Sequence, residues 1–476
     1  MKYYPIILIL LVFGCEKDNP TSNPDDEPDE NIIIPDSNTI GTLINSSTSW
    51  DSFTLFTPSQ SSDTYLIDNC GQMINKWTSD YLSGKSVYLL EDGSILRSGE
   101  IINENIRIGG IGGAIELIDW DDNLLWSYVY SSDQYSHHHD AIPLPNGNFL
   151  LLVATRKTSE EAIENGRDPS TLTEGELYNE QIIEVTPIGQ NQIEIVWEWN
   201  VWDHLIQDFD PTKANYGIIS DNPQLMDINF IGRSNNKADW LHANGLAYNS
   251  MKDEIIISFQ GTSELFIIDH STTTLEAASH TGGFHNKGGD IIYRWGNPQV
   301  YDQGSSGNRT LYGQHYPHWI PDSYPDGGKI IIFNNGLDRE GNYSEVNIIS
   351  PPTDGFGNYL YQTGTAFLPE EAEWQYNDIG NFSSEIISSA QRLANGNTLI
   401  CEGQKGRFFE ISSNNRIVWE YINPDSGSGI LTQGEQGLDN AVFRALKYSQ
   451  DYQAFNNREL IPENPIELEP NIGNCQ

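Results

Sequence analysis

Positively charged residues are scarce in this 476-residue chain, which has 25 Lys and Arg against 67 Asp and Glu. The formal net charge of −42 argues against a nucleic-acid partner, because a polyanion would be repelled. The same field repels small anions at long range. Any anion that binds must therefore be held by a local group of hydrogen-bond donors.

Several familiar catalytic signatures are also missing. The chain has 4 Cys and no cysteine pairs at zinc-ligand spacing, no phosphate-binding glycine loop and no nucleophile elbow. The glycine-rich residues 109–113 lie between expected strands, so we interpret them as a flexible connection rather than a dinucleotide-binding turn. Nothing in these patterns predicts a cofactor.

Long apolar runs are absent, and the run at residues 6–13 is too short to span a bilayer. It follows Lys2 and leads into Leu-Val-Phe-Gly-Cys at residues 11–15, which resembles a bacterial lipobox, although Phe13 is bulky for that position. We therefore expect residues 1–15 to be a lipoprotein signal peptide with Cys15 as the lipidated residue. The protein would be exported and membrane-anchored, in the periplasm or at the outer membrane or cell surface; a plain cleaved signal is the alternative.

Residues 16–40 are rich in Asp, Glu, Asn and Pro, which predicts a disordered acidic tether. Beyond it the chain contains a divergent repeat, clearest at residues 388–420. That unit has four short apolar strands with an Asn395-Gly396 hairpin turn between the first two. The same order recurs in four units that end at Trp126, Trp199, Trp295 and Trp374.

The two ends of the repeat region supply the pieces of one more unit. Residues 64–77 match its last two strands and residues 443–448 its first. We therefore predict an all-β, six-bladed β-propeller over residues 41–476, with the closing blade shared by N- and C-terminal strands. A disulfide between Cys70 and Cys475 could hold that blade closed, or both could be free thiols. An insertion at about 203–239 is expected to hold a short helix or a lid.

A histidine stands seven residues before the first turn of three successive units: His139, His242 and His315. Lys85 and Ser388 occupy the equivalent position of the first and fifth units. The first strand of each blade lines the channel of a propeller, so the three histidines should meet near one mouth. His137 and His138 are weaker candidates, because adjacent strand residues point to opposite faces.

The loops that leave the second strands should border the same mouth, and they are rich in hydrogen-bond donors. Such a group suits a small anion such as sulfate or phosphate. His318 is either a further contact for a ligand or packs against Trp319. The loop donors are Arg156, Lys157, Gln260, Asn334, Arg339, Gln404 and Lys405.

Several ordered segments resemble the bacterial arylsulfotransferases, the aryl-sulfate sulfotransferases. They are His138-His139-Asp140 with residues 145–148, Asp239-Trp240-Leu241-His242, Gly313-Gln314-His315 with residues 333–336, and residues 390–393 with 395–400. The likeness runs from about residue 65 to residue 448. It implies a six-bladed propeller that moves a sulfuryl group from a phenolic sulfate ester to a phenol, through a sulfated histidine, without a nucleotide sulfate donor or other cofactor.

The resemblance also implies site residues. His242 and His315 match family segments, Arg339 matches the arginine after the Asn-Gly loop, and with His139 they are the expected catalytic residues. The family's nucleophilic histidine is expected on the next blade, where residues 383–389 hold none and Ser388 stands at the inner position. The expected substrate-binding residues are Asn334, Lys157, Arg156, Lys405, Gln391, Arg392 and His318.

Two other functions compete with this hypothesis. Three convergent histidines can bind zinc with an open fourth position, as in a metalloenzyme. A propeller can also be a non-catalytic binding module, which the missing fifth-blade histidine favours. In the transferase hypothesis one neutral imidazole attacks sulfur, a second exchanges a proton with the phenol, and Trp240, Tyr316 and Trp319 either stack on the aryl ring or pack beneath the rim.

Overall fold

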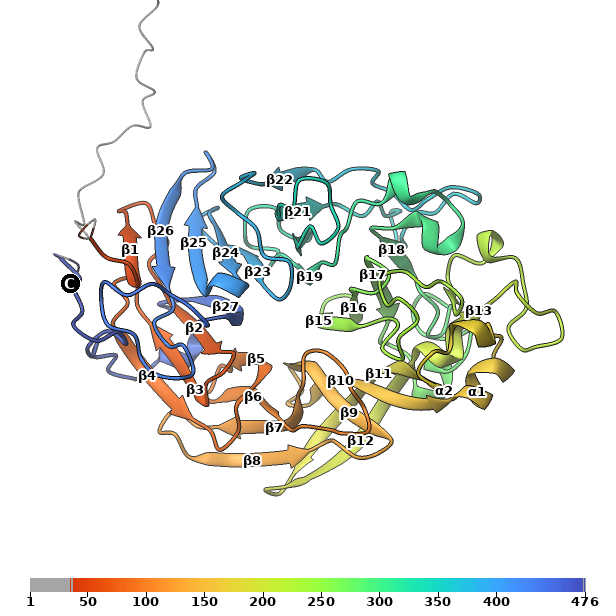
Figure 1. The fold of residues 1–476 in the computed structure, drawn as a ribbon, viewed down its shortest axis with the longest axis horizontal. Helices are drawn as coiled ribbons and strands as arrows, with labels where there is room; N and C mark the ends of the chain where they lie inside the picture. The colour runs from red at the N-terminus through yellow and green to blue at the C-terminus, as the bar shows by residue number, and fades with distance from the viewer. Residues whose placement is uncertain (1–34, 36, 474, 476) are drawn as a thin grey trace, which may run out of the picture.

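The computed structural model describes residues 35, 37–473 and 475. It confirms the six-bladed propeller: six antiparallel sheets stand around a central axis, with one strand of each innermost (Figure 1). The expected lipidation site Cys15, and the tether apart from residues 35 and 37–40, lie outside the described residues. Among the described helices, none combines the length and apolar character needed to cross a membrane.

The first three blades follow one another along the chain, and the strands of each blade are given from the innermost to the outermost. Blade one has β5 (Ser83–Leu89), β6 (Ile95–Glu100), β7 (Gly113–Ile118) and β8 (Leu124–Val129). Blade two has β9 (Tyr135–Pro143), β10 (Phe149–Thr158), β11 (Glu176–Ile188) and β12 (Gln192–Asn200). Blade three has β15 (Ala243–Asn249), β16 (Glu254–Phe259), β17 (Glu264–Asp269) and β18 (Tyr293–Trp295).

Blades four to six complete the ring. Blade four has β19 (His315–Trp319), β20 (Ile330–Asn334), β21 (Glu345–Ile349) and β22 (Trp374–Tyr376). Blade five has β23 (Ser389–Arg392), β24 (Thr398–Glu402), β25 (Arg407–Ile411), β26 (Ile417–Ile422) and, as a fifth outer strand that the repeat did not predict, β1 (Gly41–Asn45). Blade six has β27 (Val442–Ser449), β2 (Ser52–Pro58), β3 (Asp63–Ile67) and β4 (Met73–Thr78).

Both chain ends hold the closing blade together, as predicted. The C-terminal strand β27 pairs antiparallel with the N-terminal strand β2, so blade six contains segments almost 400 residues apart in the chain. Cys70, in the turn between β3 and β4, forms a disulfide with Cys475. Cys401 is buried in β24 and free.

A repeated tryptophan joins neighbouring blades. On the fourth strand of five blades the indole Nε1 donates to a backbone carbonyl in, or at the end of, the connection between the third and fourth strands of the next blade. The bonds run from Trp77 to Asp119, Trp126 to Gln192, Trp199 to Gly289, Trp295 to Pro369 and Trp419 to Asn69, at 2.7–3.0 Å. A buried indole needs such a partner, which explains the tryptophan at this position of these five blades.

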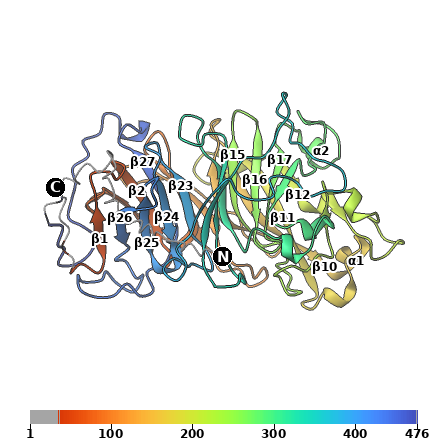
Figure 2. The same cartoon turned by 90° about the horizontal axis from the view of Figure 1, so that it is seen from above.

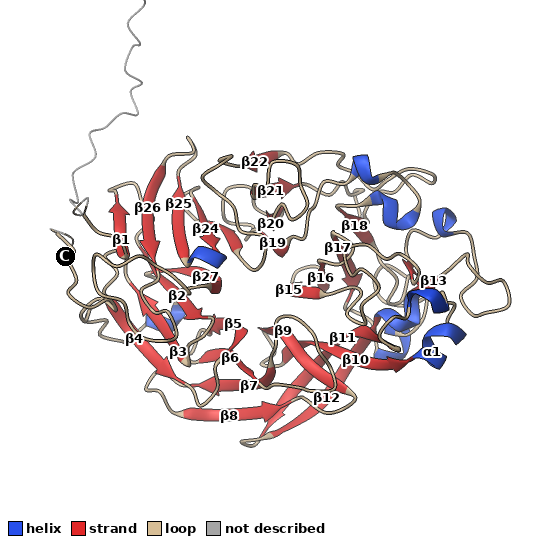
Figure 3. Cartoon of the chain, viewed as in Figure 1, coloured by secondary structure: helices blue, strands red, loops and turns tan. Residues whose placement is uncertain are grey.

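The two described α-helices lie outside the ring of strands, on the side of blades two and three (Figures 2 and 3). They are α1 (Ser159–Glu164) and α2 (Thr274–Ala277). Residues 203–239 contain short elements, including a parallel pair of β13 (Leu205–Ile206) and β14 (Met226–Asp227). The 3₁₀ helices are η1 (Pro169–Thr171), η2 (Val201–His204), η3 (Ile219–Asp221), η4 (Pro298–Tyr301), η5 (Ser306–Asn308), η6 (Gly403–Lys405) and η7 (Gln453–Phe455).

Candidate functional site

The start of the innermost strand is irregular in blade after blade. Lys85, His139, His242 and Ser388 all have positive φ, at 98°, 54°, 48° and 88°, which side-chain-bearing residues rarely adopt. In blade four the positive φ falls one residue later, on Tyr316. Blades one to four also shift register here, as in a β-bulge. Such bulges redirect side chains and are common beside functional sites.

The three mouth histidines, His139, His242 and His315, converge as the repeat predicted. The rings of His139 and His242 lie 5.0 Å apart and nearly perpendicular. Phe443, from the innermost strand of blade six, lies 6.1 Å from His139 and 6.2 Å from His315, centroid to centroid. The charge of Lys85 also acts on His139, so blades one to four and blade six contribute to one cluster.

Two of these histidines are each oriented by a hydrogen-bond acceptor that faces the ring nitrogen Nδ1. Nδ1 of His242 lies 2.6 Å from Oδ2 of Asp239. Nδ1 of His315 lies 2.7 Å from Oδ1 of Asn335, whose amide nitrogen donates to two backbone carbonyls. A carboxylate or amide oxygen only accepts, so each ring carries a proton on Nδ1, and in the neutral form of the ring Nε2 is the unprotonated nitrogen.

The Nδ1 atom of His139 faces a second histidine, which sets the position of its proton in the same way. Nε2 of His138 donates to Glu180 at 3.0 Å, and Nδ1 of His138 lies 2.8 Å from Nδ1 of His139. With its proton on Nε2, neutral His138 accepts at Nδ1, so His139 donates from Nδ1 and its Nε2 is unprotonated. Glu180 also accepts from the backbone of Ala243, beside His242.

Burial and charge divide the three rings into two types. Burial, with some help from neighbouring charges, lowers the pKa of His139 well below its usual value and that of His315 to about 3. Both are neutral at pH 7. Burial also opposes the charged form of His242, but the Asp239 carboxylate outweighs it together with other groups, and the pKa of His242 is raised.

The glycine-rich segment 109–113 covers this cluster and is therefore more than a flexible connection. A Cβ on Gly110 would lie 2.1 Å from Nε2 of His139, and one on Gly109 would lie 2.5 Å from Cε1 of His242. The carbonyl of Gly110 accepts from the backbone N–H of His139 at 2.8 Å. Only glycine permits this close approach to the two rings.

A cavity of about 860 Å³ opens beside the cluster. His242, Asp239, Gln260 and Gly109 form part of its lining. The His242 side chain is 19% exposed, whereas His139 and His315 are each 3% exposed. Of the three mouth histidines, His242 is the one that lines this cavity. Its charged lining consists of Arg107, Arg156, Arg233 and Lys237 with Glu104, Glu174 and Glu176.

Several donors expected around the mouth have partners elsewhere, which corrects the sequence interpretation. Arg339 pairs with Glu345 at 2.9 Å and lies between the rings of Tyr312 and Tyr343. Asn334 is fully buried and uses both ends of its amide on Thr310, Tyr312 and Asn347. These side chains hold the outer connections of blade four in place.

The other expected substrate contacts are also divided. Arg156 borders the cavity and pairs with Glu176, whereas Lys157 lies 5.1 Å from the ring of Trp202. Lys405 pairs with Glu402. Gln391 pairs with the backbone of Lys447, and Arg392 with Asp326 beneath Trp374. Among these, Arg156 is the one that the structure brings to the cavity.

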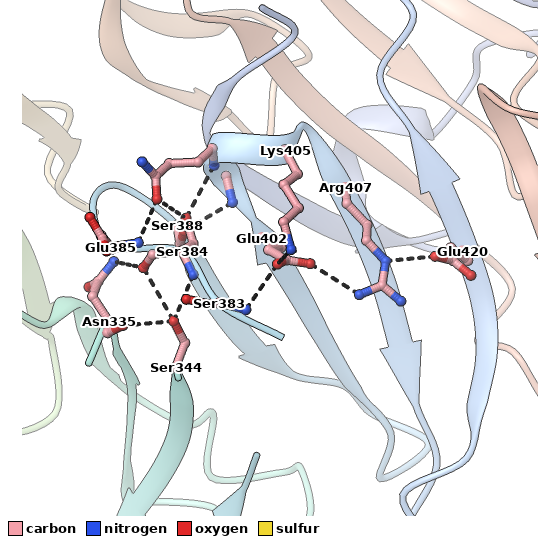
Figure 4. Close-up of polar contacts among 12 residues, drawn as sticks. Asn335, Ser344, Ser383, Ser384, Glu385, Ser388, Glu402, Lys405, Arg407 and Glu420 are labelled. Carbon is pink, nitrogen blue, oxygen red and sulfur yellow. Dashed lines mark hydrogen bonds and ion pairs between the residues drawn. The ribbon is translucent and has the colours of Figure 1, made fainter. Parts of the chain in front are cut away.

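Blade five shows what replaces the expected histidine (Figure 4). Ser388 Oγ lies 2.9 Å from Ser384 Oγ and accepts from the backbone N–H of Gly403. Asn335, the acceptor for His315, donates to the carbonyl of Ser384 in the same network. Ser388 is buried and hydrogen-bonded, so blade five supports His315 indirectly and presents no nucleophile.

A buried ion pair joins the innermost strands of blades two and six. Arg444 lies 2.9 Å from Asp140, stacks 3.7 Å from the ring centre of Tyr316, and Asp140 also accepts from Tyr88 at 2.9 Å. His318 and Trp319 line a separate cavity of about 320 Å³ with Tyr88 and Tyr316. His318 packs against Tyr316, at 4.3 Å between ring centres, rather than the expected Trp319.

Sequence reasoning missed the residues that orient the histidines: Asp239, Asn335, His138 and Glu180. Asp239 and Asn335 belong to the segments that carried the family resemblance, but no role was given to them. His138 was set aside because of strand alternation, and the positive φ of His139 breaks that alternation. Trp240, expected to stack on an aryl ring or pack, is buried and donates to the carbonyl of Tyr178.

Comparison with known proteins gives a family and a general fold likeness. The family model described as Arylsulfotransferase (ASST) matches residues 42–445. No curated protein matches the sequence. Solved structures with similarity include a protein of unknown function from Bacteroides caccae, with 12% identity, 83% of this chain and 98% of that chain covered, and a TM-score of 0.43. Virginiamycin B lyase from Staphylococcus aureus has 12% identity, 82% and 85% coverage, and a TM-score of 0.34.

Proposed function

Because this chain belongs to the arylsulfotransferase family, we propose that it transfers a sulfuryl group from a phenolic sulfate ester to a phenolic acceptor, without a nucleotide sulfate donor. The family supports a sulfotransferase activity. The finer proposal concerns which side chains of this protein carry the reaction, and it is argued from the mouth histidines and the cavity beside them.

The observation that carries the proposal is the state of His242. Its Nδ1 is bound to Asp239 at 2.6 Å, and the ring lines the 860 Å³ cavity. The unprotonated Nε2 of a histidine held in this way is a competent nucleophile. We assign His242 as the residue that is sulfated. His139 and His315 are buried and neutral, so they place no positive charge beside the nucleophile, and their lowered pKa values make them weak proton acceptors.

The reaction proceeds in two balanced steps. Nε2 of His242 attacks sulfur, the N–S bond forms, and the S–O bond to the aryl group breaks with both electrons leaving on the phenolate. The oxygen of the acceptor phenol then attacks the same sulfur, the N–S bond breaks, and the phenol loses its proton to a neighbouring base or water. Asp239 stabilises the positive charge that His242 carries between the steps.

Cationic side chains of the cavity would hold the sulfate in an otherwise acidic protein. Arg233 is half-buried and is oriented by Asp338 at 2.7 Å and the carbonyl of Leu337 at 2.9 Å. Arg156, Lys237 and the amide of Gln260 line the same space. The charge on the non-reacting oxygens of a transferring group is stabilised by such donors, as in phosphoryl transfer.

The test is the release of nitrophenolate from p-nitrophenyl sulfate, with and without phenol. We expect release that depends on phenol, and a loss of about 10³-fold or more in His242→Ala. His285→Gln is the matched control, because His285 is paired with Glu254 outside the cavity and glutamine keeps a donor. Mass spectrometry of the enzyme quenched without acceptor should find one sulfuryl group, on His242.

Two results would contradict the proposal. Retained turnover in His242→Ala, or a sulfuryl group on another residue, would refute the role of His242. Binding of a sulfate ester with no turnover for any phenol would support the non-catalytic binding module instead. Ser388, which stands where the family's nucleophilic histidine is expected, would then mark the loss of catalysis.

We further propose that the chain is exported and anchored to a membrane through lipidated Cys15. The Cys70–Cys475 disulfide supports this, because disulfides persist mainly in oxidising compartments. The wild-type protein should incorporate radiolabelled palmitate and fractionate with membranes. The Cys15→Ala variant should do neither. A soluble, unlabelled wild type would refute the anchor.

A further inference from the structure

Three side chains to which the sequence assigned no role lie together between blades two and three. His204 ends η2, directly after blade two, and His280 and Asp290 lie in the connection between α2 and β18 of blade three. One nitrogen of each ring and one oxygen of Asp290 lie within 4.8 Å of one another. Within residues 35, 37–473 and 475, this is the one group of three His, Cys, Asp or Glu that meets that condition.

The hydrogen bonds of His204 turn its Nδ1 toward Asp290. Its Nε2 lies 2.8 Å from the carbonyl oxygen of Ala277, and a carbonyl only accepts, so Nε2 carries a proton. The other ring nitrogen, Nδ1, faces Oδ1 of Asp290 at 2.8 Å. An imidazole nitrogen and a carboxylate oxygen placed in this way can bind one metal ion together.

The same carboxylate oxygen also lies 2.7 Å from Nδ1 of His280. Three ligand atoms from two segments of the chain therefore point at one place. In a tetrahedral zinc site, with bonds of about 2.0 Å, neighbouring ligand atoms are about 3.3 Å apart. Small side-chain rotations would open the observed contacts to that spacing.

The surroundings of His204 are those of a metal ligand. Metal-binding histidines usually donate their other ring N–H to a carbonyl or carboxylate, as Nε2 does here. The ring is buried, and it stacks on Trp199 at 5.8 Å with an interplanar angle of 10°. Trp199 in turn donates to the carbonyl of Gly289, next to Asp290. The ring is therefore held in position before any ion arrives.

We propose that His204, His280 and Asp290 bind a divalent transition-metal ion, with zinc as the best match to a ligand set of two imidazoles and one carboxylate. His280 is 60% exposed, so an ion can enter from solvent, and a water molecule would complete the coordination. The site stands at the Trp199 contact between blades two and three. Its expected role is to fasten the end of η2 to the outer connection of blade three.

The test is zinc titration of the full chain, stripped of metal and carrying no histidine tag, by calorimetry. We expect one equivalent to bind with high affinity, and a rise in the thermal midpoint that EDTA reverses. Cobalt should give the intense visible absorption of a tetrahedral complex. His280→Ala is the main variant, because an exposed side chain can be removed without unfolding the protein; we expect its zinc affinity to fall at least 10-fold. Asp290→Asn should weaken binding in the same way.

Two controls separate this site from other histidines. His285→Gln changes a neighbouring histidine that pairs with Glu254, and should bind zinc as the wild type does. His242→Ala removes the channel-mouth candidate and should also leave binding unchanged. The proposal is overturned if zinc does not saturate at one equivalent, if His280→Ala binds as tightly as the wild type, or if His242→Ala is the variant that loses the ion.

Discussion

Asp239 Oδ2 lies 2.6 Å from Nδ1 of His242, and this contact both orients the ring and raises its pKa. The pair links the end of the insertion at residues 203–239 to the innermost strand of blade three. It gives the site one histidine whose pKa is raised and which is partly exposed, whereas its two neighbours are buried and have lowered pKa values.

The first prediction concerns the pH dependence of turnover. The unprotonated ring of His242 is the nucleophile, so kcat/KM should rise with pH and level off above the raised pKa. In Asp239→Asn the carboxylate that raises the pKa is gone while burial remains, so the rise should move to lower pH. The plateau should also fall by about 10²-fold, because the ring loses its orientation.

The pH profile of p-nitrophenyl sulfate turnover measures both effects. Glu104→Gln is the matched control, since it removes one negative charge from the same cavity at an exposed position. It should leave the profile nearly unchanged. A profile of Asp239→Asn that coincides with the wild type would show that Asp239 does not act on the nucleophile.

The second prediction concerns the glycine segment above the histidines. Gly110→Ala places a methyl group 2.1 Å from Nε2 of His139 and forces alanine to a φ of +62°. The conformation alone costs about 1–2 kcal/mol, and the clash must displace the ring or the segment. We expect lower stability and a loss of activity.

Gly147→Ala separates these two causes. Gly147 has a φ of +86° in the Asn-Gly turn of blade two, and nothing lies within 4 Å of its Cβ position. It should show the conformational cost in thermal unfolding but keep its activity per folded molecule. Equal activity of the two variants would mean that the segment does not position the histidines.

The third prediction concerns the buried ion pair between blades two and six. Arg444 and Asp140 are 2% and 0% exposed, so Arg444→Met leaves a carboxylate buried without its cation. The free energy of unfolding in urea should fall by about 3–5 kcal/mol. Lys213→Met breaks the exposed pair with Glu164 and should change it by less than about 1 kcal/mol. Similar losses in the two variants would refute the distinction.

The fourth prediction concerns the disulfide of the closing blade. Cys70 and Cys475 are 405 residues apart, so their bond restricts the unfolded chain strongly. Reducing agent should lower stability by about 2–4 kcal/mol, measured by urea unfolding. A Cys70→Ala, Cys475→Ala double variant should start at the lower value and not respond to reducing agent. Cys401→Ala should respond as the wild type does.

The repeat in the sequence determined the architecture of this protein. Alternating apolar residues, Asn-Gly turns and a closing tryptophan predict four-stranded blades, because each blade must bury both faces against its neighbours. The two half-units at the chain ends predict how the ring closes; they allow a Cys70–Cys475 disulfide or two free thiols, and the structure contains the disulfide. The same alignment predicts that His139, His242 and His315 meet, since equivalent positions of equivalent strands share one end of the channel.

Only the tertiary structure decided what each histidine does, because the deciding contacts join different strands or loops or depend on backbone irregularities. Asn335 and Glu180 come from strands or loops distant in sequence from the rings they serve, and the bulge at His139 turns His138 toward its neighbour. Arg339 and Asn334 fit the anion-binding pattern in sequence, but in the structure Arg339 pairs with Glu345 and Asn334 with Asn347, both within blade four. The spacing of apolar residues along the chain is enough to predict the strands and blades. Which polar side chains form hydrogen bonds depends on which of them the closed ring brings within about 3 Å of one another.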